Sequence, residues 1–330
     1  MIASAGDARA HVVFRNARET VQRNAPTRAV GVVRLRVLVP AGQDAGMLRT
    51  LVLLALLAIA DDGRAATAAD LRSAYASLKP ALAASAFGRP LTLVSREEGG
   101  QVTGEIHALV NHPFGLVRHA LATASDWCGV LYLHLNVKSC AAGTEAGSPV
   151  LRVALGRKAD SAEGRTFELV FNFQRVQDTG QFFQVVMTAD EGPLGSSGYR
   201  LALDAIPVAG NQAFLRLVYS VTYGAAARGA MSAYLHTLGR SKVGFTVTGR
   251  RPDGTAIYGG GIRGALERNT LRYYLAIDTW LAAAARSPPR DERWRLESWY
   301  AATEHYALQL HELPREQYLR LKSNPAPAQR

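Results

Sequence analysis

A strict alternation of apolar and polar positions fills the middle of the chain. It recurs in five runs between residues 151 and 223, and each run puts its apolar side chains on alternate positions. Such a period of two is typical of a strand that buries one face. Short connections such as Asp178-Thr179-Gly180 favour antiparallel pairing of successive strands. The five predicted strands span residues 151–155, 166–175, 182–188, 199–206 and 213–223.

The same pattern predicts two strands upstream, on either side of a helix. Residues 102–110 form the first strand, and Pro113 ends it ahead of a helix over residues 114–131. A second alternation begins at the end of this helix and indicates a half-buried strand with one solvated face. Its apolar set is Leu131, Leu133, Leu135 and Val137, and its polar set is Tyr132, His134, Asn136 and Lys138.

Helical spacing replaces the alternation towards the two ends of the chain. A long helix is predicted from Gly261 until Pro288-Pro289, and its apolar positions recur every three or four residues. Arg263 and Glu267 are expected to form an exposed pair on it. Its inward face carries Ile262, Leu266, Asn269, Tyr273, Ile277 and Trp280. The other predicted elements are helices over 71–87, 225–238, 294–312 and 314–322, a strand over 242–248, and an edge strand or linker over 91–94.

This order of elements predicts an α+β fold in which a curved antiparallel sheet wraps a long C-terminal helix, with extra terminal helices. The order resembles that of the START-like superfamily, also called helix-grip or SRPBCC, and Asp126-Trp127 matches a tryptophan common at that place in the family. The resemblance spans residues 101–285 and implies an apolar cavity between sheet and helix. The chain departs from the family in the helix at 225–238 and in the residues after the long helix.

Residues 47–68 have the pattern of a secretory signal peptide. A short basic start at Met47 precedes ten uncharged residues, and Ala66-Thr67-Ala68 offers a small-residue cleavage site. The uncharged run is short for a bilayer span; a retained anchor and a buried core helix are the alternatives. We therefore expect cleavage near Ala68 and a periplasmic or secreted product. The expected segments are 1–46, a misassigned and disordered upstream extension; 47–68, the signal peptide; 69–100, an N-terminal helix and linker; 101–285, the START-like domain; and 286–330, C-terminal helices and a tail.

Cys128 and Cys140 are the only cysteines of the chain. In an oxidising compartment we expect them to form one disulfide, joining the end of the predicted helix to the strand that follows. The alternative is a pair of inert buried thiols. Their spacing fits neither a C-x-x-C redox motif nor a zinc knuckle.

The net charge of +11 does not by itself indicate a nucleic-acid partner. Arginine outnumbers lysine and alanine is abundant, a composition that fits a genome of high GC content as well as selection for arginine. A nucleic-acid surface would need a basic stripe on one element, or aromatic residues set among basic ones. The sequence shows neither, so we expect no nucleic-acid partner.

Eight residues are predicted to line a ligand cavity, because they lie on the inner faces of the predicted strands or of the long helix. Apolar pockets with few polar groups are the usual ligand sites, whereas the alternative is a filled core. Asn269 and Tyr273 are the stronger candidates, because a buried polar group must be paired or bind something. The eight are Phe171, Phe173, Val185, Met187, Tyr219, Tyr223, Asn269 and Tyr273.

No sequence motif indicates a catalytic residue, a metal or a cofactor. His134 near Lys138 would suit acid–base work, although a solvated sheet face explains both residues as well. His107, His112 and His119 lack metal-ligand spacing on one element. The chain has no Gly-x-Ser-x-Gly, P-loop or His-Glu-x-x-His motif. We predict no metal and no cofactor.

These observations lead to three hypotheses about function. The first is an exported START-like protein that binds a lipid or other apolar small molecule between the sheet and the grip helix, without turnover. The second is an enzyme of the same fold, cyclase-like or hydrolase-like, that uses the cavity tyrosines, Asn269 or His134. The third is an envelope interaction protein whose aromatic C-terminal helices, around Trp294, Trp299 and Tyr306, dock a partner or the membrane surface.

Overall fold

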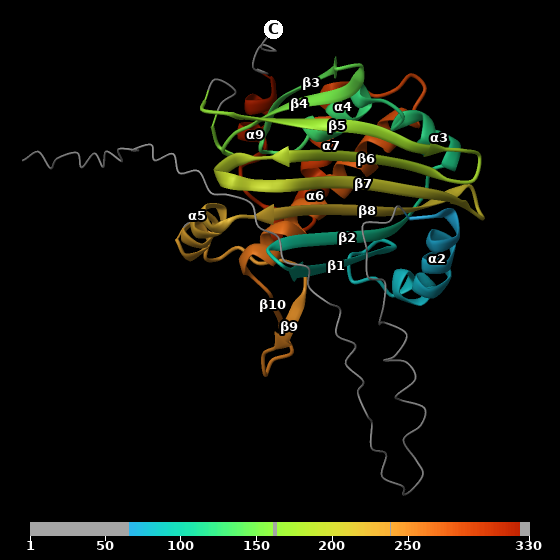
Figure 1. Cartoon of the computed structure of the whole chain (residues 1–330). Helices are drawn as coiled ribbons and strands as arrows, with labels where there is room; N and C mark the ends of the chain where they lie inside the picture. The colour runs from blue at the N-terminus through green and yellow to red at the C-terminus, as the bar shows by residue number, and fades with distance from the viewer. Residues whose placement is uncertain (1–65, 161–163, 238, 324–330) are drawn as a thin grey trace, which may run out of the picture. The chain divides into compact units, whose positions relative to one another are not determined.

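The computed structural model describes residues 66–160, 164–237 and 239–323. The predicted upstream extension, all but the last three residues of the predicted signal peptide, and the predicted tail after Ser323 lie outside these residues. The centre is an antiparallel sheet of eight strands in the order β1-β2-β8-β7-β6-β5-β4-β3 (Figure 1). The strands are β1 (Leu91–Glu98), β2 (Gln101–Val110), β3 (Val137–Glu145), β4 (Ser148–Leu155), β5 (Phe167–Asp178), β6 (Phe183–Glu191), β7 (Ser196–Val208) and β8 (Gln212–Tyr223).

The strands predicted from the alternation between residues 151 and 223 are confirmed, and so is their meander. Each strand from β3 to β8 pairs with the next one along the chain, and β8 then pairs with β2. β1 lies within residues 69–100 and forms the edge of the main sheet beside β2. The inner positions of the strands, for example Leu169, Val185 and Leu217, belong to one large core cluster. The period of two therefore placed the buried face correctly.

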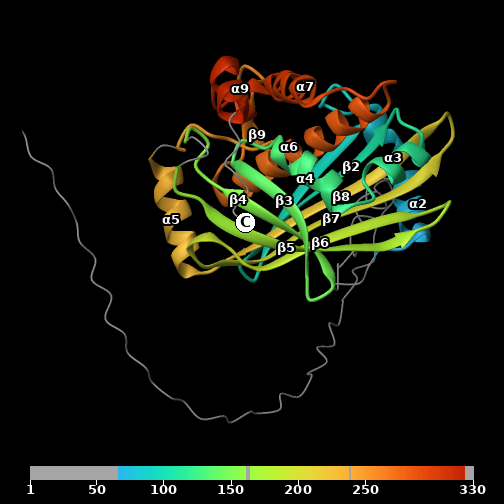
Figure 2. The ribbon, with the colours of Figure 1, turned by 90° about the horizontal axis from the view of Figure 1, so that it is seen from above.

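The long helix α6 (Gly261–Ala284) lies across the inner face of the curved sheet, as Figure 2 shows. The contact is close at β2, because a Cβ added to Gly104 would lie only 2.3 Å from Thr270 Oγ1. Thr270 itself is fully buried, with its hydroxyl bonded to Leu266 O at 2.9 Å. The α+β class and the helix-grip arrangement expected from the sequence are confirmed by this geometry.

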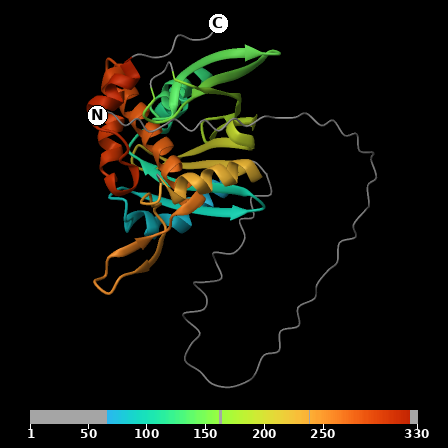
Figure 3. The ribbon, with the colours of Figure 1, turned by 90° about the vertical axis from the view of Figure 1, so that its left-hand side faces the viewer.

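Three C-terminal helices, α7 (Glu292–Glu304), α8 (Ala307–Leu310) and α9 (Arg315–Ser323), cover the side of α6 that faces away from the sheet (Figure 3). Trp299 and Tyr318 are each 1% exposed, and Trp299 Nε1 donates to Arg272 O at 3.1 Å. These two aromatic residues pack the helices onto the domain, whereas Trp294 is half-buried. α6 is consequently buried on two sides.

The predicted strand over residues 131–137 is wrong. Its first residues continue a helix, because α3 (Phe114–Ala120) is followed by α4 (Ala124–Tyr132), and β3 begins only at Val137. Its polar set is not solvated either, since His134 is 2% and Lys138 4% exposed. The C-terminal helix α9 explains this burial: Lys322 Nζ donates to His134 O at 2.8 Å and to Val137 O at 2.6 Å.

The expected exposed pair of Arg263 and Glu267 is also wrong. Glu267 is 1% exposed, and its carboxylate accepts hydrogen bonds from Ser95 Oγ at 2.5 Å and Phe245 N at 2.6 Å. Thr246 donates to it twice, from its N at 3.0 Å and its Oγ1 at 2.6 Å. Glu267 thereby holds the segment ahead of α6 against β1.

The predicted strand over residues 242–248 is displaced and does not join the main sheet. β9 (Val247–Arg250) pairs instead with β10 (Ala256–Tyr258) in a separate two-stranded hairpin. This hairpin projects from the body in Figures 1 and 3.

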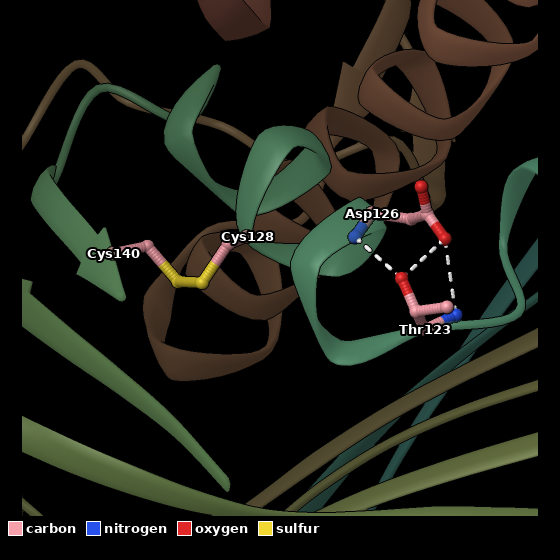
Figure 4. The surroundings of a disulfide bond; sticks show 4 residues. All are labelled: Thr123, Asp126, Cys128 and Cys140. Atoms are coloured by element: carbon pink, nitrogen blue, oxygen red, sulfur yellow. Dashed lines mark hydrogen bonds between the residues drawn. A yellow bond between two sulfur atoms is a disulfide. The ribbon is translucent and has the colours of Figure 1, made fainter. Parts of the chain in front are cut away.

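The predicted disulfide between Cys128 and Cys140 is confirmed, with Cα atoms 5.2 Å apart (Figure 4). It ties α4 to the edge strand β3. The start of α4 is fixed by a capping box: Thr123 Oγ1 accepts from Asp126 N at 3.2 Å, while Thr123 N donates to the Asp126 carboxylate at 3.0 Å. Trp127, next along the helix, is 1% exposed and donates to Leu121 O.

The remaining helices lie around the sheet. α2 (Ala68–Ala83) packs through Leu71 and Leu82 on Phe214, on the face opposite α6. α5 (Ala225–His236) follows β8, and the short 3-10 helix η2 (Pro193–Gly195) joins β6 to β7. None of the described helices is both long and apolar enough to cross a membrane.

Candidate functional site

The structure places all eight predicted ligand-binding residues in the layer between the sheet and α6. Six of them come from strands β5, β6 and β8, and two come from α6. Four are buried in the large core cluster: Phe171, Phe173, Val185 and Met187. Tyr219 is 7% exposed, and Tyr223, Asn269 and Tyr273 are half-buried.

The strand register aligns part of this set in a row across the sheet. Phe173 lies opposite Met187, Met187 opposite Leu201, and Leu201 opposite Tyr219. The row therefore has an apolar end at β5 and β6 and a tyrosine at β8. A molecule lying along it would meet aromatic and aliphatic surface first and a hydroxyl at its end.

Tyr273 of α6 meets the tyrosine end of this row. Its ring lies edge-on to Tyr219, with ring centres 5.1 Å apart, and stacks on His134 at 5.0 Å. Both neighbours are almost fully buried, at 7% and 2% exposed, yet Tyr273 itself is only half-buried.

Three tyrosine hydroxyls at this end lack hydrogen-bond partners among the described residues. They belong to Tyr219, Tyr223 and Tyr273, whereas Tyr199 bonds to Ser196 Oγ at 2.7 Å. None of the three oxygens is among the fully enclosed polar atoms that lack partners, so each retains contact with open space. The Tyr219 side chain as a whole is only 7% exposed.

The tyrosines are neutral donors at ordinary pH. Burial raises the pKa of Tyr219 well above its usual 10, and the nearby hydroxyls of Tyr273, Tyr199 and Tyr223 raise it further. Burial likewise raises the pKa of Tyr223 to about 12 and raises that of Tyr273. A protonated hydroxyl in a space of low polarity can donate to a ligand oxygen. It cannot act as a base there.

His134 adds an unsatisfied nitrogen to the same place. Its Nδ1 accepts a hydrogen bond from Asn136 N at 3.2 Å, and its Nε2 is fully enclosed without a partner. Burial lowers the pKa of His134 well below 6.5, and the charges of Arg272, Lys322 and Lys158 lower it further, although the Asn269 side chain opposes them. The imidazole is therefore neutral, and because Nδ1 accepts, the proton is on Nε2.

α5 crosses the end of this layer where Tyr223 lies (Figure 3). It begins two residues after Tyr223, and Arg228 on its first turns donates to Tyr223 O at 3.2 Å and to Glu97 at 2.8 Å. η2 lies beside its start, because a Cβ added to Gly224 would come within 2.8 Å of Gly195 O. The helix that departs from the family pattern thus begins directly at the tyrosine end of β8.

The two best-formed hollows on the described surface lie elsewhere. One, of about 330 Å³, is lined by α7 and α9 residues such as Arg293 and Arg320, and the other, of about 380 Å³, lies around Pro288 and Trp294. Both are open and bordered by charged side chains. None of the eight predicted ligand-binding residues lines either hollow.

Sequence reasoning missed Tyr199 and misplaced His134. Tyr199 opens the inner-face series that continues with Leu201 and Leu203, so the period of two on β7 contained the signal. His134 carried no local signal, because its burial comes from α9. Among the described residues, no group of three or more His, Cys, Asp or Glu side chains could hold a metal ion.

Comparison with known proteins finds solved structures that resemble the chain but no matching sequence family. No family model matches the chain, and no curated protein matches it. Among solved structures, a START superfamily protein from Mycobacterium smegmatis is 13% identical, with a TM-score of 0.28, and the match covers 42% of this chain and 92% of that one.

Two further solved structures have the same low similarity. Human StAR-related lipid transfer protein 5 is 14% identical with a TM-score of 0.26, covering 51% of this chain and 89% of that one. The Zhui aromatase/cyclase from Streptomyces sp. R1128 is 15% identical with a TM-score of 0.31, covering 57% of this chain and 96% of that one. The fold assignment rests on the topology of the sheet and the position of α6.

Proposed function

We propose that this protein binds a lipid or another largely apolar small molecule between the sheet and α6. The observation that carries the proposal is the set of three hydroxyls, on Tyr219, Tyr223 and Tyr273, that have no hydrogen-bond partner among the described residues. Buried polar groups are nearly always paired. A ligand oxygen that accepts from these hydroxyls would satisfy them.

The rest of the site suits the apolar part of such a molecule. Phe171, Phe173, Val185 and Met187 present only carbon and sulfur surface, and burying apolar ligand surface here contributes about 25 cal/mol per Å². Aromatic and thioether side chains adapt to irregular shapes. The ligand would therefore lie with its apolar body on β5 and β6 and its polar group towards Tyr219.

The raised pKa values favour binding over turnover. Tyr219, Tyr223 and Tyr273 stay protonated, and His134 stays neutral. A ligand carbonyl held by these donors would be polarised, as in an oxyanion hole. Catalysis by this site would need a substrate that reacts by polarisation alone, and recovery of an altered ligand after incubation would support that alternative.

Binding of a fluorescent long-chain alcohol tests the proposal. We expect saturable binding to the wild type, and a decrease in affinity of about three- to tenfold in Tyr219→Phe and Tyr273→Phe, since one hydrogen bond contributes about 1 kcal/mol. Tyr75→Phe, on the opposite face of the sheet, is the matched control and should bind as the wild type does. Absence of binding, or equal loss in all three variants, would contradict the proposal.

We also propose that the protein is exported. Support comes from the signal-peptide pattern over residues 47–68 and from the Cys128–Cys140 disulfide, because disulfides persist in oxidising compartments. Cleavage after Ala68 would remove Thr67, whose hydroxyl caps α2, leaving Asp70 in the first turn to interact with the new amino terminus. N-terminal sequencing of the protein from a periplasmic fraction tests export; a retained Met47 would count against cleavage.

A further inference from the structure

We propose that the ligand carries an acidic head group, a carboxylate or a phosphate, and that the protein holds it at a cationic site now filled by its own Glu312. This inference rests on the proposed binding between sheet and α6 and specifies the class of ligand. It concerns Lys158, Lys242, Arg272, Glu312 and His134, none of which the apolar part of the site uses.

Three cationic side chains from separate parts of the chain converge on one carboxylate. Arg272 Nη2 of α6 donates to Glu312 Oε1 at 2.9 Å, and Lys158, from the loop after β4, donates to the same oxygen. Lys242, which follows α5, lies 3.4 Å from Oε2. Glu312 belongs to the connection between α8 and α9, so a short surface segment inserts the carboxylate.

The convergence brings three cationic side chains and one carboxylate together in a half-buried place. Side chains of Arg272 and Glu312 are 1% and 9% exposed, and those of Lys158 and Lys242 are 24% and 23% exposed. Burial and the charge of Arg272 lower the pKa of Lys158 to about 8, even though Glu312 opposes them. Removing charge from water is costly unless it is balanced. A second anion, or one with more charge than a carboxylate, fits this environment.

The cationic site adjoins the tyrosine end of the ligand layer through one turn of α6. Arg272 Nη1 donates to Asn269 Oδ1 at 3.3 Å, and Tyr273, the next residue along, stacks on His134. Arg272 and Lys158 are close enough to His134 to lower its pKa. Asn269, a predicted ligand-binding residue on the same helix, is thus the contact that Arg272 makes towards this end of the layer.

His134 supplies an independent indication of an acceptor. Its Nε2 carries the proton, is fully enclosed, and has no hydrogen-bond partner. A buried donor without an acceptor costs about 1–3 kcal/mol. Phosphate and carboxylate oxygens are strong acceptors that would satisfy it, whereas another cation or an apolar chain would not.

The arrangement makes Glu312 an internal stand-in for the ligand's acid. When the head group binds, the Glu312 carboxylate leaves Arg272 and Lys158 and moves to solvent, which the exposed neighbours His311 and Pro314 allow. The two carboxylates compete for the same donors. Removing the charge of Glu312 should then strengthen binding of acids and leave neutral ligands unaffected.

The test compares three fluorescent probes with one alkyl chain: an alcohol, the matching carboxylic acid and the matching alkyl phosphate. In the wild type we expect an acid to bind more tightly than the alcohol. Lys158→Gln and Lys242→Gln should reduce that preference about tenfold, and Glu312→Gln should increase the affinity for acids by about tenfold, with the alcohol unchanged. Glu316→Gln, an exposed neighbour on α9, is the matched control.

The outcomes distinguish failure of the acidic head group from failure of the proposed ligand binding. If the alcohol binds and neither acid is preferred, or if the preference survives Lys158→Gln and Lys242→Gln, the acidic head group is refuted while binding between sheet and helix stands. If no probe binds, both the acidic head group and the proposed ligand binding are refuted. Preference for the phosphate or for the carboxylate identifies which acid the site takes. Should Glu312→Gln fail to fold, the two lysine variants, at partly exposed positions, still decide.

Discussion

Four polar atoms in the interior carry the functional argument: the hydroxyl oxygens of Tyr219, Tyr223 and Tyr273, and Nε2 of His134. By contrast, the buried cation Lys322 donates to the carbonyls of His134 and Val137. Unsatisfied groups gathered at one end of a layer differ from scattered ones, because one bound molecule can satisfy them together. Substitutions that remove these atoms can be compared with substitutions that remove polar groups paired within the fold.

The first prediction contrasts two tyrosine hydroxyls. Tyr219→Phe should change the free energy of unfolding by less than about 0.5 kcal/mol, because its hydroxyl has no partner to lose. Tyr318→Phe should lower it by about 1 kcal/mol, because the Tyr318 hydroxyl donates to Leu133 O at 2.9 Å in the buried core. Urea denaturation of both variants measures the difference. Equal losses would show that Tyr219 is paired in solution.

The second prediction concerns acid. Lys158 and Arg272 outweigh burial and lower the pKa of Glu312 from 4.5 to about 2. Its ion pairs therefore stabilise the fold fully above about pH 4.5, and this contribution disappears as the pH falls towards 2. Glu312→Gln should be less stable than the wild type at pH 7, and the gap should close below pH 3 or so. Denaturation curves that stay parallel from pH 7 to the acid limit would contradict this.

At the scale of elements, two close contacts fix α6 and α4. Gly104 of β2 lets α6 approach through Thr270, and Gly129 of α4 lies against the Trp280 ring, where an added Cβ would come within 2.2 Å. The disulfide then ties α4 to β3. The grip helix is held by glycines on two different elements, so the layer between it and the sheet has a fixed depth at these points.

Two glycine-to-alanine variants test this packing. Gly104→Ala should destabilise the protein by about 1–3 kcal/mol, because a well-packed interior does not accept another methyl group. Gly115→Ala, in α3 with no atom near the added Cβ, should be neutral or stabilising by up to about 1 kcal/mol. Thermal denaturation of the two variants gives the comparison. A tolerated Gly104→Ala would mean that α6 sits further from the sheet.

The disulfide supports a separate prediction. It closes a loop with a sequence separation of 12, and a loop of this size contributes about 3 kcal/mol in the chain-entropy model. Reduction should therefore lower the urea midpoint of the wild type markedly. The Cys128→Ala/Cys140→Ala variant should resemble the reduced wild type, and reductant should not affect it. A midpoint insensitive to reductant would show that the thiols are free in the purified protein.

Sequence alone gave strong information about elements whose partners are close along the chain. The strands between residues 151 and 223 pair with their sequence neighbours, so alternation and turn residues were sufficient. The strand predicted over residues 131–137 was wrong because alternation of leucine also occurs where both sets of side chains are buried. There α9, almost two hundred residues away along the chain, supplies Lys322 to the exposed carbonyls. No local pattern contains that contact.

At the scale of the whole molecule, the chain is a helix-grip domain with an added layer. α7, α8 and α9 cover α6, and α5 follows β8 at one end of the sheet. The added layer explains why Arg272, which donates to Leu310 O and to Glu312, is 1% exposed. It also brings Glu312 to α6. Six of the eight predicted site residues followed from strand periodicity, whereas the cationic site depends wholly on this long-range layer.

The central claim is that an apolar molecule occupies the layer between the sheet and α6. Native mass spectrometry of the protein isolated from cells, followed by solvent extraction, tests it most directly. We predict a discrete added mass that is lost on extraction, and a lipid or other apolar compound in the extract that rebinds to the stripped protein. A single bare mass, with no rebinding of cellular lipid extract to the folded protein, would contradict the account.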